Sequence, residues 1–198
     1  MKSAAAANEF ITCRAAVRRI LSEFLQVPTG SITIGRNPCP KCHSRQHGPP
    51  AIHRPATDRW ISISHTTGLG LLAVSPFPVG VDVEAVRQVR TDELADTTTT
   101  PAERHALLAQ PPGTARSTAF LRCWTRKEAV LKATGVGIGS DLNQLETRFW
   151  APGPAHITTN ATGTPTTWRV DTLPLPHPWI AALALPHHTP HAVTLQHH

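Results

Sequence analysis

GVDVE at residues 80–84 is the most informative stretch of this 198-residue chain. Its apolar residues predict a buried strand, and Asp82 and Glu84 lie two residues apart, so their side chains share one face. Acidic residues are depleted in strands, and like charges this close repel each other unless a cation lies between them. Two interpretations are therefore open: the acids bind a cation, or, more simply, they are two solvated acids at the end of a strand.

A second stretch, WTRKEAVLK at residues 124–132, predicts a helix that carries partners for such a cation. Glu128 and Lys132 are four residues apart and share one helix face. On its own, the pair is typical of an exposed helix surface. If the helix packs beside strand 80–84, three carboxylates and a lysine converge. In proteins Mg²⁺ usually binds one or two carboxylates, and phosphate oxygens of the substrate complete its coordination shell. The two stretches together therefore predict a site for magnesium and a phosphate group.

Taken together, the two stretches resemble the surfactin-type 4′-phosphopantetheinyl transferases, whose pattern is G-(V/I)-D-(V/I)-E and then W-x-x-K-E-(A/S)-x-x-K. Three more segments are similar to this family: CRAAVRRIL at 13–21, ISISHTTG at 61–68 and WIAALALP at 179–186. The resemblance implies an α+β fold, a pseudo-dimer of two similar α/β halves, each a helix packed on a small, mainly antiparallel sheet. The expected halves are residues 1–79 and 80–186, followed by a disordered tail, 187–198.

The resemblance also implies an activity, transfer of the 4′-phosphopantetheine arm of coenzyme A to a serine of an apo acyl or peptidyl carrier protein. Adenosine 3′,5′-bisphosphate would leave, as in enzymes of the holo-[acyl-carrier-protein] synthase type that serve polyketide or nonribosomal peptide biosynthesis. The implied roles are metal ligands (Asp82, Glu84, Glu128), catalytic residues (Glu128, Lys132) and coenzyme A contacts (Arg14, Ser64, His65, Asp82, Lys132).

Apolar periodicity and turn residues predict helices at 8–26, 101–109 and 115–134, and strands at 31–35, 60–64, 69–75, 79–84, 145–150, 155–159, 166–172 and 179–185. Thr100 and Glu103 have the spacing of a capping box at the start of the second helix, and Gly135 is expected to end the third. Arg14 falls inside the apolar stripe of the first helix; either its side chain extends to solvent at the edge of the stripe, or it points inward, which is costly unless it meets an anion. The resemblance makes that anion the 3′-phosphate of coenzyme A. Residues 36–58, rich in proline, predict a loop. Residues 85–99 predict a mobile polar loop, and 85–115 is the candidate segment for carrier docking.

The net charge of +6 permits a nucleic acid, a phosphorylated ligand or an acidic protein partner. The few aromatic residues do not alternate with basic ones as a stacking platform for nucleic acid requires. A small anionic ligand or an acidic partner therefore fits better. No apolar run approaches the roughly 20 residues of a membrane span, and the N-terminus lacks the apolar core of a secretory signal. We expect a cytoplasmic monomer.

Two features leave alternatives open. Cys39 and Cys42, with His43 or His47, form half of a zinc pattern, against the simpler interpretation of a reduced cysteine pair in a loop. Pro49 stands where the family pattern H-G-(K/R)-P has a basic residue. A degenerate relative that binds coenzyme A or a carrier domain without transfer therefore remains an alternative. A basic module that binds zinc and nucleic acid is another.

Overall fold

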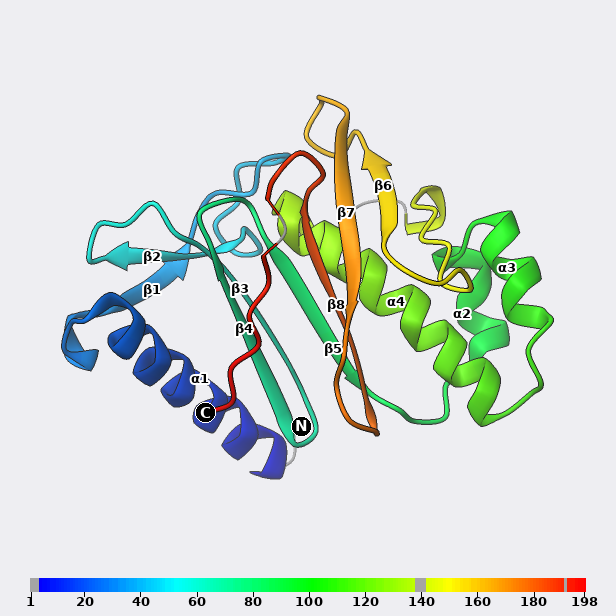
Figure 1. Ribbon diagram of the computed structural model, residues 1–198, viewed down its shortest axis with the longest axis horizontal. Coiled ribbons are helices and arrows are strands. Elements are labelled where there is room, and N and C mark those ends of the chain that lie inside the picture. The colour runs from blue at the N-terminus through cyan, green and yellow to red at the C-terminus, as the bar shows by residue number, and fades with distance from the viewer. Residues whose placement is uncertain (1–3, 138–141, 191) are drawn as a thin grey trace.

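The computed structural model describes residues 4–137, 142–190 and 192–198. Within them the chain forms helices and small antiparallel sheets, which confirms the predicted α+β class (Figure 1). The helices are α1 (Ala4–Leu25), α2 (Thr91–Thr98), α3 (Pro101–Leu108) and α4 (Thr114–Thr134). The strands are β1 (Thr33–Arg36), β2 (Pro50–Arg54), β3 (Trp60–Thr66), β4 (Leu69–Ser75), β5 (Gly80–Ala85), β6 (Ala155–Thr159), β7 (Thr166–Leu173) and β8 (Trp179–Pro186).

The first part of the chain packs α1 against two antiparallel hairpins, β1–β2 and β3–β4. Its core contains the buried face of α1, with Val17 and Leu21, against Ile52 of β2 and Ile61 of β3. These residues alternate along the strands or recur at helical spacing, which is why one face of each element is buried. The helical spacing of the apolar residues thus predicted α1 correctly.

The second part packs α4 on a four-stranded antiparallel sheet of order β5-β8-β7-β6. The core between them contains Ala129, Val130 and Ala133 of α4 against Val170 of β7 and Ala184 of β8. Small side chains on α4 and β8 allow helix and sheet to approach closely. The helix ends at Gly135, whose φ of 75° is the left-handed conformation that glycine adopts without strain.

Strands β3 and β5 join the two parts through side chains rather than through a backbone ladder. The hydroxyl oxygens of Ser62, Ser64 and Thr66 accept hydrogen bonds from the backbone N–H groups of β5 at Val81, Val83 and Ala85, respectively. The three hydroxyls alternate along β3, so they all face β5. This row of hydroxyls places the GVDVE strand between the β3–β4 hairpin and the second sheet.

Helices α2 and α3 pack beside α4, at the end of the molecule opposite α1 (Figure 1). The predicted capping box at the start of α3 is confirmed, since Thr100 Oγ1 accepts from the Glu103 N–H and the Glu103 carboxylate accepts from the Thr100 N–H. Glu103 also forms a fully buried ion pair with Lys127, at 2.6 Å. Lys127 is therefore buried in the core and not on the solvated surface of the helix.

Three predicted segments differ from the structure. The loop expected at 36–58 contains β2, because its alternating residues pair with β1. The mobile loop expected at 85–99 contains α2, so the argument from mobility for carrier docking on 85–115 does not hold. The strand expected at 145–150 is absent from these described residues, which are irregular at 145–148 and form a turn at 149–150. In each case the tertiary partner, or its lack, decided the local conformation.

The last residues form no regular element within 187–190 and 192–198, and residue 191 lies outside the described part of the chain. Thr189 is buried, and His198 lies 3.7 Å from Glu23 of α1. Among the described residues, no helix is both long enough and apolar enough to cross a bilayer.

Candidate functional site

Gly80 sets the spacing between the GVDVE strand and helix α4. A Cβ atom at this position would lie 1.8 Å from the carbonyl oxygen of Ala129 and 2.5 Å from the backbone nitrogen of Ala133, both impossible contacts. Glycine therefore allows β5 to lie directly against the backbone of α4. Since side chains alternate along a strand, Asp82 and Glu84 face the same side as Gly80.

This close approach brings Asp82 to Lys132, four residues after Glu128 on α4. Lys132 Nζ lies 2.7 Å from Asp82 Oδ1 and donates a second hydrogen bond to the Val81 carbonyl oxygen at 3.2 Å. Ser64 Oγ donates to the same Asp82 oxygen at 2.8 Å. Asp82 is almost completely buried. Burial raises the pKa of Asp82, although the charge and hydrogen bond of Lys132 oppose the rise.

Glu128 is the second buried carboxylate of the site. Burial raises its pKa from 4.5 to about 7, and the negative charge of Asp82 adds to the rise, while the charge of Lys132 opposes it. The Asp82 Oδ2 and Glu128 Oε1 atoms are both buried without a hydrogen-bond partner among the described residues. Buried polar atoms are nearly always satisfied. Two unsatisfied carboxylate oxygens in one site are the donor set that a hard divalent cation prefers.

Glu84, the third predicted ligand, is less buried than the other two. Its carboxylate pairs with the exposed guanidinium of Arg87 three residues later. Glu84 still contributes to the charge on the site, because it adds to the raised pKa of Glu128. The structure therefore brings Asp82, Glu128 and Lys132 together directly, with Glu84 at the margin and held by a different partner.

A cleft of about 1040 Å³ opens beside these residues, between α1, the β1–β2 hairpin, the loop before β2 and the end of α4. Glu128 is the one acid among the described residues that line it. Its basic side chains are Arg14, Arg18, Arg36, Arg45 and Lys132. Clefts lined by one sign of charge concentrate ligands of the opposite sign. The charge of this cleft therefore favours a polyanionic ligand.

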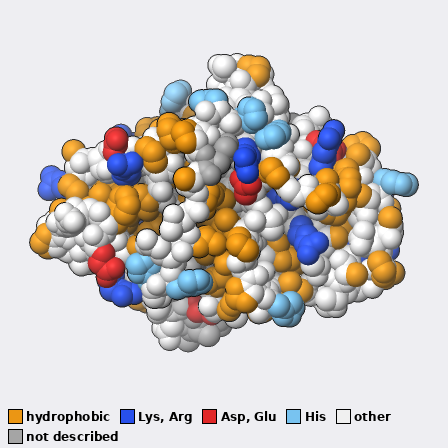
Figure 2. Space-filling view, in the orientation of Figure 1, with side chains coloured by type: hydrophobic (Ala, Val, Ile, Leu, Met, Phe, Trp, Pro, Cys, Tyr) orange, Lys and Arg blue, Asp and Glu red, His pale blue; other side chains and the backbone are white. Residues whose placement is uncertain are grey.

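Positive charge is not concentrated in one region of the face shown in Figure 2. On the face in Figure 2, the Lys and Arg side chains that the structure describes are scattered among hydrophobic and neutral ones and form no continuous basic stripe. A basic stripe or face is the usual electrostatic footprint of nucleic-acid binding. The visible face offers no support for that alternative.

Arg14 lies at the mouth of the cleft and not in the apolar core. Its side chain is exposed, and its guanidinium lies 5.1 Å from the centre of the Phe10 ring. The same ring meets His65 edge-on at 6.1 Å. The prediction that Arg14 points inward is corrected to this cation–π position at the edge of the stripe. Arg14 and His65 consequently face the cleft together.

Ser64 and His65 lie on opposite faces of β3, as adjacent strand residues must. His65 lines the cleft, whereas Ser64 is buried and bonds Asp82 and the Val83 N–H. In this structure Ser64 orients the carboxylate of Asp82. Pro49 also lines the cleft and packs on Gly135, at the end of α4.

The second part of the chain identifies the family. A model of the 4′-phosphopantetheinyl transferase superfamily matches residues 78–184, which contain β5, α4, β6, β7 and most of β8. The chain belongs to this superfamily. The match confirms the resemblance seen in the sequence.

Three curated proteins are similar to this superfamily member. A putative 4′-phosphopantetheinyl transferase of Synechocystis is 30% identical over 140 residues, 70% of this chain and 54% of the relative. The transferase HetI of Nostoc is 30% identical over 156 residues, 77% of this chain and 62% of HetI. The transferase psf-1 of Bacillus pumilus is 27% identical over 150 residues, 71% of this chain and 56% of psf-1. The matches thus span between half and two thirds of each relative's length.

Sequence reasoning missed part of this site. Arg18 follows Arg14 by four residues and so shares its helix face, a signal that was present in the sequence. Arg36 and Arg45 come from β1 and from the loop before β2, and only the tertiary fold brings them to the cleft. Gly80 is the first residue of the family pattern, but its packing role could not be predicted, because that role depends on how closely another element packs against it.

Proposed function

We propose that this superfamily member transfers the 4′-phosphopantetheine arm of coenzyme A to a serine of an apo acyl or peptidyl carrier protein. The observation that carries the proposal is the pair of unsatisfied, buried carboxylate oxygens of Asp82 and Glu128. Glu128 lines the cleft with the arginines, and Asp82 contacts Lys132, which also lines it. Coenzyme A carries a pyrophosphate and a 3′-phosphate, so it matches both the charge of the cleft and the need for a bridging cation.

Asp82 and Glu128 would hold Mg²⁺, and Glu84 would join them if it released Arg87. Their raised pKa values fit this role, because each buried carboxyl group lacks enough positive charge nearby to make ionisation favourable. When bound, the cation would supply neutralisation of the pyrophosphate charge. The name of the superfamily agrees with a phosphate-containing substrate.

The remaining steps fall to side chains of this chain. The carboxylate of Glu128 would take the proton of the attacking serine hydroxyl, directly or through a water molecule. Lys132, anchored by Asp82, would place its positive charge on a phosphate oxygen. Positioning and charge stabilisation of this kind supply most of the catalysis in phosphoryl-type transfers.

Arg14 and His65 would bind the 3′-phosphate end of the nucleotide at the mouth of the cleft. Their shared contact with Phe10 fixes both side chains on that side. Ser64 would act on the substrate only through Asp82, whose carboxylate it orients.

One inference on domain organisation accompanies this proposal. The halves 1–79 and 80–186 form a pseudo-dimer, each with a long helix on antiparallel strands, joined along β3 and β5. The support is the position of the cleft, which takes residues from α1 of the first half and α4 of the second. Each half alone therefore lacks part of the proposed site.

The test is a transfer assay with coenzyme A, Mg²⁺ and a panel of apo acyl and peptidyl carrier proteins. Mass spectrometry should detect one phosphopantetheine on the carrier serine. Chelation of Mg²⁺ and the change Asp82→Ala should each abolish the reaction, while Glu93→Gln, an exposed carboxylate on α2, should leave it intact. Coenzyme A binding without transfer to any carrier would instead identify a degenerate relative, and undiminished transfer by Asp82→Ala would refute the assigned site.

A further inference from the structure

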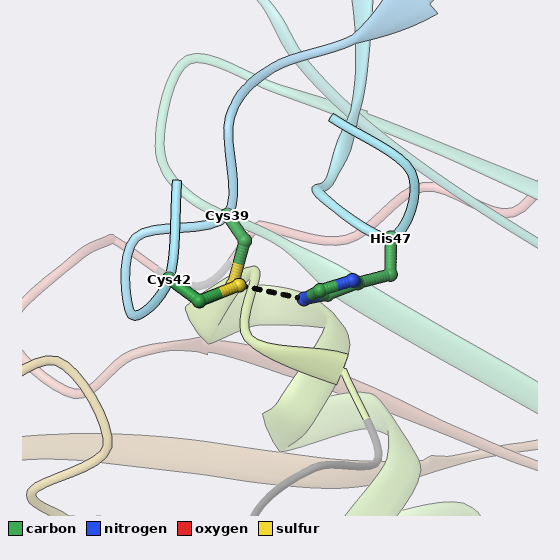
Figure 3. A group of neighbouring side chains, drawn as sticks. All are labelled: Cys39, Cys42 and His47. Carbon is green, nitrogen blue, oxygen red and sulfur yellow. Dashed lines mark hydrogen bonds between the residues drawn. The ribbon is translucent and has the colours of Figure 1, made fainter. Parts of the chain in front are cut away.

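A second group of possible metal ligands lies outside the carboxylate site, in the loop between β1 and β2. The ligand atoms of Cys39, Cys42 and His47 all lie within 4.8 Å of one another. Cys42 Sγ is 3.1 Å from His47 Nε2, and the three side chains converge on one point (Figure 3). In a tetrahedral zinc site neighbouring ligand atoms are about 3.6–3.8 Å apart, from Zn–S and Zn–N bonds of about 2.3 and 2.0–2.1 Å. We propose that Cys39, Cys42 and His47 bind a zinc ion.

The loop that carries these residues is closed and held by its own backbone. The Asn37 N–H donates to the Pro49 carbonyl oxygen at 2.9 Å, which joins the two ends of the loop. Gly48 permits this closure, since a Cβ there would lie 1.8 Å from the Asn37 carbonyl oxygen. Inside the loop the Cys39 N–H donates to the Ser44 carbonyl oxygen, so the chain turns back toward Cys39. The ligands are thus pre-positioned and need only side-chain rotation to close on an ion.

The ligand set favours zinc over the cation of the carboxylate site. Thiolate sulfur and imidazole nitrogen suit zinc, whereas magnesium requires oxygen ligands. Binding would replace the protons of the two thiols, which leave to solvent. Cys39 is buried while Cys42 and His47 are exposed, so the ion can enter from solvent and keep a water molecule as its fourth ligand.

The position of this group gives the ion a structural role at the cleft. Cys39 belongs to the core around α4, beside Val136, and Pro49 packs on Gly135 at the end of that helix. His47 and Arg45, from the exposed side of the same loop, line the cleft. A zinc ion would therefore connect the basic rim of the cleft to the helix that carries the buried carboxylates.

The experiment measures zinc directly on the full chain, without coenzyme A or carrier, so its outcome does not depend on the transfer reaction. The protein, purified under reducing conditions, is stripped with a chelator, reloaded with zinc chloride, desalted and analysed for metal content. We expect one zinc per chain, a higher melting temperature after loading, and tetrahedral thiolate absorption bands when Co²⁺ replaces zinc. The changes Cys39→Ser, Cys42→Ser and His47→Ala should each lower zinc affinity at least tenfold.

His43→Ala is the matched control, because His43 is exposed in the same loop and lies outside the group of three. It should retain the full zinc content and cobalt spectrum. The proposal would be overturned if the wild type held no more zinc than Cys42→Ser, or if the cobalt spectra were octahedral. Equal zinc loss from His43→Ala and His47→Ala would also overturn it. A Cys39–Cys42 disulfide that persists under reducing conditions would also overturn it.

Discussion

Replacing Glu128 by glutamine should make the metal-free protein more stable at alkaline pH while it abolishes transfer. Glu128 is buried, Asp82 lies near it, and its Oε1 atom has no hydrogen-bond partner among the described residues. An ionised carboxylate at this position therefore lowers the stability of the fold when no cation is bound. Glutamine has nearly the same shape and removes the charge, but it also removes the proposed metal ligand and base.

The magnitude follows from the pKa of Glu128, which burial raises from 4.5 to about 7. Each pKa unit corresponds to about 1.4 kcal/mol, so the ionised form costs about 3 kcal/mol in the folded state. Because the folded-state pKa is the higher one, the folded protein binds more protons than the unfolded chain between pH 4.5 and about 7. Stability is therefore lost as the pH rises through this window. Below pH 4.5 the variant and the wild type should be equally stable, and above pH 7 the variant should gain the full difference.

The measurement is the unfolding free energy from urea titrations in a chelator, at closely spaced pH values from about 4.5 to about 8.5, which bracket the shifted pKa. For a chain of this size, about 3 kcal/mol at pH 8 corresponds to roughly 6–12 °C in melting temperature. Glu93→Gln, which removes an exposed carboxylate paired with Arg90, should stay within about 0.5 kcal/mol of wild type at every pH. A Glu128→Gln variant that is no more stable than wild type at pH 8 would show that Glu128 is not a buried, strained carboxylate.

Three further substitutions test other parts of the argument. Gly80→Ala should lower the urea midpoint by the equivalent of at least about 1–3 kcal/mol, because its Cβ would overlap the backbone of α4. Gly30→Ala, with no atom within 4 Å of the new Cβ, should unfold like wild type. Arg14→Ala should weaken coenzyme A binding about tenfold in calorimetry and leave 3′-dephospho-coenzyme A unchanged, whereas equal losses would assign it a structural role. Lys127→Ala should cost about 3–5 kcal/mol in chemical unfolding, because it leaves the Glu103 carboxylate unpaired in the core; a loss below about 1 kcal/mol would contradict this.

The long helices were predictable because their signals are local. Helical spacing of apolar residues located α1 and α4, the Thr100–Glu103 capping box located α3, and Gly135 ended α4. The strand β2 and the helix α2 were missed for the opposite reason. The alternation in β2 lies between prolines and becomes a strand only by pairing with β1, and α2 has a polar sequence that is helical only where it packs beside α4.

The candidate site divides in the same way. Face sharing on one strand or one helix is a local rule, and it was enough to group Asp82 with Glu84 and Glu128 with Lys132. The distance between the two pairs does not follow from that rule, since it depends on Gly80 and the close packing that it permits.

The chemical types at the site and the family were already established by the amino-acid sequence, because two short stretches with fixed spacing contain the carboxylates and the lysine. Tertiary packing determined the partner of each charged side chain. Lys127 pairs with Glu103 in the core while Lys132 pairs with Asp82, although both lysines lie on one helix. The physical reason is that burial and partner distance set the energy of a charge, and both are properties of contacts between segments far apart in the chain.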